Sequence, residues 1–154
     1  MSSFVEISDK IIESTLEIFT GMVMMEISVD GELPLKLGIL KKSITGMVGL
    51  AGTHKGVIAV HLPEQVALAV TTSFLGMEVE EMNADVHDAI GEIANMLGGN
   101  LKTILSDLGK DIQLSLPSTI SGDFSFSSQA DVDQVIIPFQ TPAGIFYVEV
   151  ELER

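Results

Sequence analysis

Three polar side chains with chemical potential follow one another at helical spacing near the middle of the chain. Asp88 and Glu92 are four residues apart, and Glu92 and Asn95 are three apart. On an α-helix these spacings make the side chains neighbours on one face. The carboxamide of Asn95 offers one acceptor and two donors in fixed geometry. Since an amide neither titrates nor attacks, the group is suited to holding a water molecule rather than to acting as a nucleophile.

The element that must position these side chains is a helix, which we predict from Asp85 to Leu105. Placed at about 100° per residue, its apolar residues fall within a band roughly 80° wide. Asp88, Glu92 and Asn95 lie on the opposite face together with Gly99. Asn83 precedes the helix and is a suitable N-cap. The apolar stripe comprises Val86, Ile90, Ile93, Leu97, Leu101 and Ile104.

Glycines accompany the polar residues along the predicted helix. Gly91, Gly98 and Gly99 each cost a helix interior about 1 kcal/mol relative to Ala. One reason to accept this cost is to let another backbone or a bulky partner approach closely. The alternative is that Gly98 and Gly99 bend or end the helix. Because the apolar pattern continues to Leu105, we predict that the helix continues through Gly98 and Gly99. We also predict that Asp88 and the three glycines bind a partner.

The motif resembles a known family. Asp88, Glu92 and Asn95, embedded in A-I-G-E-I-A-N-M-L-G-G-N-L, resemble the signature helix of the CheC/CheX/FliY phosphatases, which dephosphorylate the response regulator CheY in bacterial and archaeal chemotaxis. The similarity extends from residues 44–52 to residues 121–122, where L-P-S-T-I-S-G is similar to CheX. The chain carries one credible copy of the motif, which favours the CheX branch over CheC, whose members commonly carry two.

The resemblance implies a function and roles for two residues. The implied activity is hydrolysis of the aspartyl phosphate of a CheY-type response regulator in chemotaxis signalling. Asn95 would place the attacking water, and Glu92 would pair with the active-site lysine of the regulator. The Mg²⁺ ion would belong to the regulator, so the resemblance implies no cofactor for this chain. It also implies a homodimer, which would cover open strand edges.

Two other interpretations compete with the phosphatase. The three polar residues could be an ordinary solvated helix face. A domain of the same superfamily could also bind a response regulator or a motor protein without hydrolysing anything, as a CheC-like or flagellar-switch module. The presence of both Glu92 and Asn95 argues against that second interpretation. The first 40 residues keep it open, because they resemble the family least and could carry a docking function.

Composition excludes several classes of partner and site. The 154 residues carry a net charge of −14, which argues against binding to nucleic acid or to an anionic membrane surface. The absence of cysteine excludes disulfides and thiolate metal sites. No run of 18 apolar residues and no basic, signal-like start is present. We therefore expect a cytoplasmic protein without membrane association.

Periodicity elsewhere predicts a single α+β domain over residues 1–154. Its two layers would be a largely antiparallel β-sheet and long helices packed on one face, as in CheC and CheX. We expect Pro138 to mark the end of a strand or an edge position. The predicted helices outside the motif are 4–23 and 63–75, and the predicted strands are 43–50, 56–62, 112–116, 124–126, 132–137 and 145–152.

The three histidines are further candidates for metal ligands or catalytic bases. His54 and His61 could converge with Glu64, but no metal-ligand spacing is met, so we predict no metal site. His87 lies about 140° from Glu92 on the predicted helix. That separation is poor for a base acting beside Glu92.

Overall fold

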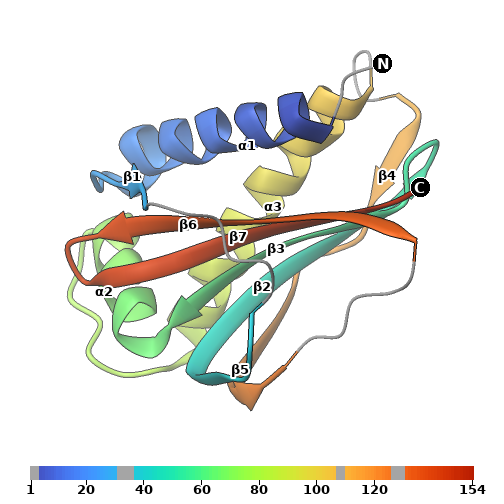
Figure 1. Ribbon diagram of the computed structural model, residues 1–154. Helices are drawn as coiled ribbons and strands as arrows, with labels where there is room; N and C mark the ends of the chain where they lie inside the picture. The colour runs from blue at the N-terminus through green and yellow to red at the C-terminus, as the bar shows by residue number, and fades with distance from the viewer. Residues whose placement is uncertain (1–3, 31–36, 107–109, 126–130) are drawn as a thin grey trace.

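The structure, a computed structural model, describes residues 4–30, 37–106, 110–125 and 131–154. Three α-helices and seven strands are described there, together with one short π-helix (Figure 1). In chain order they are α1 Phe4–Ile18, η1 Phe19–Val23, β1 Ser28–Val29, β2 Leu40–Gly52, β3 Gly56–Pro63, α2 Glu64–Leu75, α3 Ala84–Leu105, β4 Ile112–Leu114, β5 Ser118–Phe124, β6 Val132–Thr141 and β7 Gly144–Glu153.

The strands form one antiparallel sheet in the order β1-β6-β7-β3-β2-β4. The fifth strand, β5, pairs with β2 along the same edge as β4, so the two short strands follow one another beside the long one. Hairpins join β2 to β3 and β6 to β7. The predicted antiparallel sheet is therefore confirmed.

The helices cover one face of this sheet, as the side-chain alternation requires (Figure 1). On β3, Ile58 and Val60 are fully buried and belong to the core that also contains the apolar stripe of α3. Because successive side chains of a strand point to opposite faces, the neighbouring Ala59 and His61 lie on the face away from the helices. The predicted two-layer α+β architecture is confirmed.

The signature helix α3 begins at Ala84, one residue before its predicted start, and ends at Leu105 as predicted. The Oδ1 atom of Asn83 accepts a hydrogen bond from the backbone N–H of Val86 at 3.2 Å, which confirms the predicted N-cap. The helix continues through Gly98 and Gly99 and ends at Leu105. Five of the six stripe residues have no exposed surface. Their burial sets the rotation of the helix and leaves its polar face outward.

Several predicted boundaries were wrong. The predicted strand 43–50 is longer, as β2 Leu40–Gly52, and the predicted strand 132–137 continues to Thr141. The predicted strand 124–126 corresponds to β5, which begins at Ser118 and ends at Phe124. The first α-helix ends at Ile18 and a π-helical turn replaces its last five residues. The predicted strand 112–116 ends at Leu114, which leaves Leu116 outside the sheet and 87% exposed. The prediction at position 126 lies outside the described residues.

Pro138 was predicted to mark the end of a strand or an edge position, and the structure agrees with this prediction only in part. It does not end a strand, because β6 runs through it to Thr141. Its carbonyl accepts the backbone N–H of Asp30 at 2.9 Å, so its backbone polar atoms point toward the β1 edge and away from β7. A residue without an N–H is tolerated there because no ladder bond to β7 is lost.

Candidate functional site

The polar face of α3, defined by Asp88, Glu92, Asn95 and Gly99, presents the predicted chemistry to solvent. The three polar side chains are exposed, and Gly99 is half-buried. The opposite side of the helix is buried against α1, α2 and the sheet. Side chains on a helix packed in this way are held more precisely than side chains on a loop. The structure thus brings Asp88, Glu92 and Asn95 together as predicted.

Two of the motif glycines serve the packing of the helix on its own sheet. A Cβ on Gly98 would lie 3.0 Å from Val48 Cγ1, and one on Gly91 would lie 3.6 Å from Thr119 Cγ2. Both glycines are buried, because their position on the helical wheel is the flank that faces β2 and β5. A Cβ on Gly99 would meet nothing within 4 Å. Of the three glycines predicted to bind a partner, the structure places only Gly99 on the open polar face.

His87 fastens α3 to strand β5. Its Nδ1 lies 2.7 Å from Thr119 Oγ1, and its Nε2 lies 3.2 Å from Ser121 Oγ. Both ring nitrogens are therefore engaged by hydroxyls of the strand. The residue acts as a tie between two elements, in keeping with its predicted unsuitability as a base beside Glu92.

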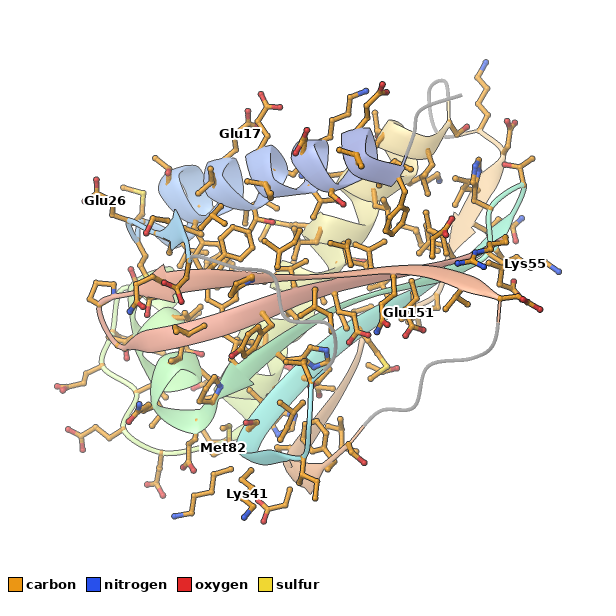
Figure 2. The ribbon with its side chains drawn as sticks, viewed as in Figure 1. Glu17, Glu26, Lys41, Lys55, Met82 and Glu151 are labelled. Atoms are coloured by element: carbon orange, nitrogen blue, oxygen red, sulfur yellow. The ribbon has the colours of Figure 1, made fainter. Side chains whose placement is uncertain are left out.

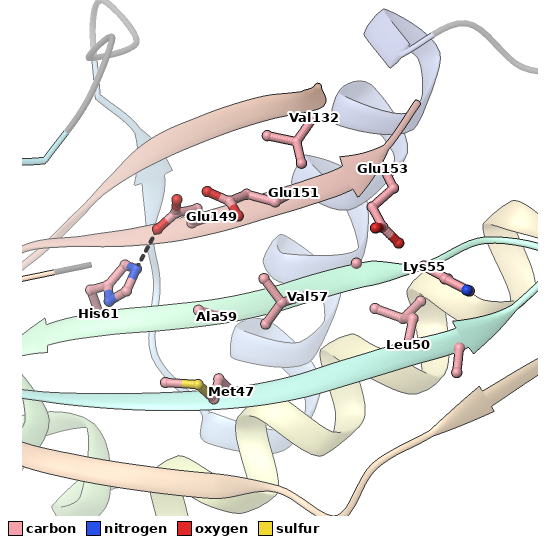
Figure 3. A pocket seen from close by; sticks show the side chains of 12 residues that line it. Met47, Leu50, Lys55, Val57, Ala59, His61, Val132, Glu149, Glu151 and Glu153 are labelled. Carbon is pink, nitrogen blue, oxygen red and sulfur yellow. Dashed lines mark hydrogen bonds and ion pairs between the residues drawn. The ribbon is translucent and has the colours of Figure 1, made fainter. Parts of the chain in front are cut away.

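A hollow lies elsewhere, on the face of the sheet that the helices leave uncovered (Figure 3). Its volume is about 470 Å³. Within the described part of the chain, no cluster of His, Asp and Glu side chains could hold a metal ion. The hollow is lined by Met47, Leu50, Ala51, Lys55, Gly56, Val57, Ala59, His61, Val132, Glu149, Glu151 and Glu153.

A chain of hydrogen bonds crosses four strands at one end of this hollow. His61 Nδ1 lies 2.7 Å from Thr45 Oγ1, and His61 Nε2 lies 2.8 Å from Glu149 Oε1. Gln134 donates to the other oxygen of the same carboxylate. The network joins β2, β3, β7 and β6 in turn. His61 therefore pairs with Glu149, a residue that sequence reasoning missed, and not with Glu64.

The network also determines the charge state of Glu149. Burial alone would raise the pKa of this carboxyl, but hydrogen bonds from His61 and Gln134 and the charge of His61 outweigh the burial. The pKa of Glu149 consequently lies below its ordinary value of 4.5. Since both ring nitrogens of His61 are bonded to the protein, the pair serves the sheet and offers no free base to the hollow. The polar face of α3 remains the better candidate for chemistry on a partner.

Among the described residues, none of the helices combines the length and apolar character needed to cross a membrane.

Comparison with known proteins points to one family. A sequence model described as "Chemotaxis phosphatase CheX" matches residues 44–140. The CheY-P phosphatase CheX of Thermotoga maritima is 31% identical over 81 residues, which are 52% of this chain and 52% of that protein. The match thus spans about half the length of this curated relative.

Solved structures agree with that match. The chemotaxis protein CheX of Desulfovibrio desulfuricans is 30% identical, with a TM-score of 0.82 over 96% of this chain and 99% of that one. A complex of CheX with CheY, BeF₃ and Mg²⁺ from Borrelia burgdorferi has a TM-score of 0.80 at 22% identity, over 96% of this chain and 97% of the other. At that identity the second likeness concerns the fold alone.

Proposed function

The chain belongs to the chemotaxis phosphatase CheX family, and we propose that it dephosphorylates the aspartyl phosphate of a CheY-type response regulator in chemotaxis. One observation carries the proposal. Asp88, Glu92 and Asn95 stand together and exposed on a helix whose other side is buried. An open face of this kind suits a macromolecular substrate, because the reacting group must be brought to it by a partner's surface.

The proposed mechanism depends on positioning. Phosphoryl transfer through a loose transition state requires little covalent help from a catalyst. The Asn95 carboxamide holds a water molecule in line with the bond that breaks, and Glu92 pairs with the lysine in the regulator's active site. An acceleration of about a hundredfold corresponds to about 2.7 kcal/mol, which is within the range that orientation of a reactant supplies.

The metal ion of the proposed reaction belongs to the regulator. The solved complex from Borrelia burgdorferi contains CheX, CheY, BeF₃ and Mg²⁺, so a protein of this fold has been captured with such a partner. The ion neutralises charge on the transferred phosphoryl group, and this chain supplies no ligand to it. Asp88 and Gly99 form the remaining contact surface of the polar face.

We also propose that the chain is a homodimer. The described sheet ends in short strands at both edges, β1 on one side and β4 and β5 on the other. Unpaired strand edges favour pairing with another chain. A second copy would cover at least one of these edges.

The test of the phosphatase is loss of phosphate from a phosphorylated CheY-type regulator of the same genome, followed with Mg²⁺ present. We expect the chain to accelerate the loss. Asn95→Ala should lower the acceleration by about a hundredfold, and Glu92→Gln should lower it strongly as well. Glu17→Gln is the matched control, because Glu17 is an exposed carboxylate that projects from α1, on another helix (Figure 2).

The alternative outcomes separate the candidate functions. Acceleration lost in both variants, with unchanged circular dichroism and Tm, supports the proposed roles of the two residues. Binding to the regulator without acceleration would replace the phosphatase with a non-catalytic docking module. Acceleration that survives Asn95→Ala would place the chemistry on another face.

A further inference from the structure

The connection between β4 and β5 is an ordered segment that runs beside α3. The backbone N–H of Ser115 donates to the Gly49 carbonyl at 2.9 Å, and the Gly49 N–H donates to Ser115 Oγ at 2.9 Å. The same hydroxyl donates to the Leu116 carbonyl at 3.0 Å. At the other end, Ser118 is in register with Met47 of β2. The backbone that carries Leu116 is therefore held in place from both sides.

Neighbouring contacts place this connection at the level of Asn95. A Cβ on Gly91 would lie 3.9 Å from Pro117 Cβ, and Gly98 lies against Val48, the residue that precedes the partner of Ser115. Along the axis of α3, Leu116 therefore lies between the positions of Gly91 and Gly98. Asn95 falls between the same two glycines and lies only about 40° and 60° from them on the helical wheel. Asn95 is the exposed residue of α3 on the flank nearest the connection.

The exposure of Leu116 is unusual for an ordered, apolar side chain. It is 87% exposed, more than any other large hydrophobic residue described. If the apolar alternation of Ile112 and Leu114 had continued, Leu116 would lie within the sheet, but β4 ends at Leu114. An apolar group on a rigid segment loses little conformational freedom when a partner covers it. Removing its apolar surface from water on contact with a partner would favour the complex.

We infer that Leu116, supported by Pro117, is an apolar docking contact for the receiver domain of the phosphorylated regulator, immediately beside the water held by Asn95. The inference rests on the proposed function and adds a contact outside the polar face of α3. Because the contact is the same in ground and transition states, it contributes to KM and leaves kcat nearly unchanged. It selects regulators that present an apolar surface next to the phosphoaspartate.

The experiment compares Leu116→Ala and Leu116→Asp with Val5→Ala and Val5→Asp. Val5 is 70% exposed on α1 and is the matched control. Phosphate release is measured over a range of concentrations of phosphorylated regulator, and binding is measured with the regulator activated by BeF₃ and Mg²⁺. We expect Leu116→Ala to raise KM and Kd about tenfold, equivalent to about 1.4 kcal/mol, with Leu116→Asp larger. The Val5 variants should match the unsubstituted chain.

The results separate this inference from the proposed function. KM and Kd that are equal in the Leu116 and Val5 variants, while the unsubstituted chain is active, would overturn the contact and leave the phosphatase intact. A chain that binds the regulator without accelerating phosphate loss would overturn the phosphatase, and weaker binding by the Leu116 variants would still support the contact. A chain that neither binds nor accelerates would overturn both.

Discussion

His61 and Glu149 show what single residues contribute away from the candidate site. Each lies on the face of the sheet without helices, and each is nearly buried. A buried carboxylate is tolerated when hydrogen bonds and an opposite charge compensate the loss of hydration. Through Thr45 and Gln134 the pair connects four strands. We interpret the His61–Glu149 pair as a structural link between the strands of the sheet on which α3 packs.

The His61–Glu149 pair makes the free energy of unfolding depend on pH. The pKa of Glu149 is lowered on folding, so its ionised form stabilises the folded state above the unfolded pKa near 4.5, and this contribution is lost as pH falls through the folded pKa. We expect Glu149→Gln to lower the free energy of unfolding by about 1–3 kcal/mol at pH 7. The difference from the unsubstituted chain should shrink below pH 4.5. Urea titrations at pH 7 and pH 4 measure both values.

The control for this prediction is Glu153→Gln, which removes an exposed carboxylate from the same strand. It should leave the pH dependence unchanged. A loss of stability in Glu149→Gln that is equal at both pH values would mean that the carboxylate acts through packing alone.

At the scale of elements, the position of α3 depends on how closely it approaches β2. A Cβ on Gly46 would lie 2.9 Å from the Ile90 carbonyl oxygen and 3.0 Å from Ile90 Cγ2. Together with Gly98 against Val48, this glycine lets the helix lie directly on the strand. Displacing the helix would move Glu92 and Asn95, because they are carried by the same rigid element.

Two alanine substitutions test this packing in opposite directions. Gly46→Ala should destabilise the chain by about 1–3 kcal/mol through overpacking against a backbone atom that cannot rotate away. Gly99→Ala meets open space, so the gain in helix propensity should stabilise the chain by up to about 1 kcal/mol. Denaturant unfolding of both variants measures the changes. Equal effects of the two substitutions would contradict the close approach.

At the scale of the whole molecule, charge and exposed strand edges act against each other. The net charge of −14 creates repulsion between copies at low ionic strength. The edges of the sheet favour association. Repulsion between charges more than a Debye length apart is screened by salt, while backbone pairing and apolar contact persist.

We therefore expect the dimer to tighten as salt is added. Sedimentation equilibrium at about 0.3 M salt should give twice the 16.5 kDa mass of one chain, and dissociation should increase near 0.01 M, where screening extends about 30 Å. A mass of one chain at micromolar concentration in both conditions would contradict the dimer.

The sequence by itself determined the features that depend on neighbours within about four residues. The limits of α3, its cap at Asn83 and its polar face follow from helical periodicity and local hydrogen bonding. The strands of the two hairpins follow from alternation and from turn residues between them. This local information was sufficient to place Glu92 and Asn95 side by side on one helix. The resemblance of this helix to the signature helix of the CheC/CheX/FliY phosphatases indicated the family.

Only the tertiary structure decided which distant segments meet. His61 and Glu149 are 88 residues apart, and nothing local to either residue encodes the order in which β3 and β7 pair. Gly91 and Gly98 pack against strands of the same chain instead of facing a partner, and this too is decided by contacts between distant segments. The exposure of Leu116 likewise depends on where β4 stops pairing with β2. Contacts between elements arise from packing of the whole core, and a local pattern carries no record of the partner that the packing selects.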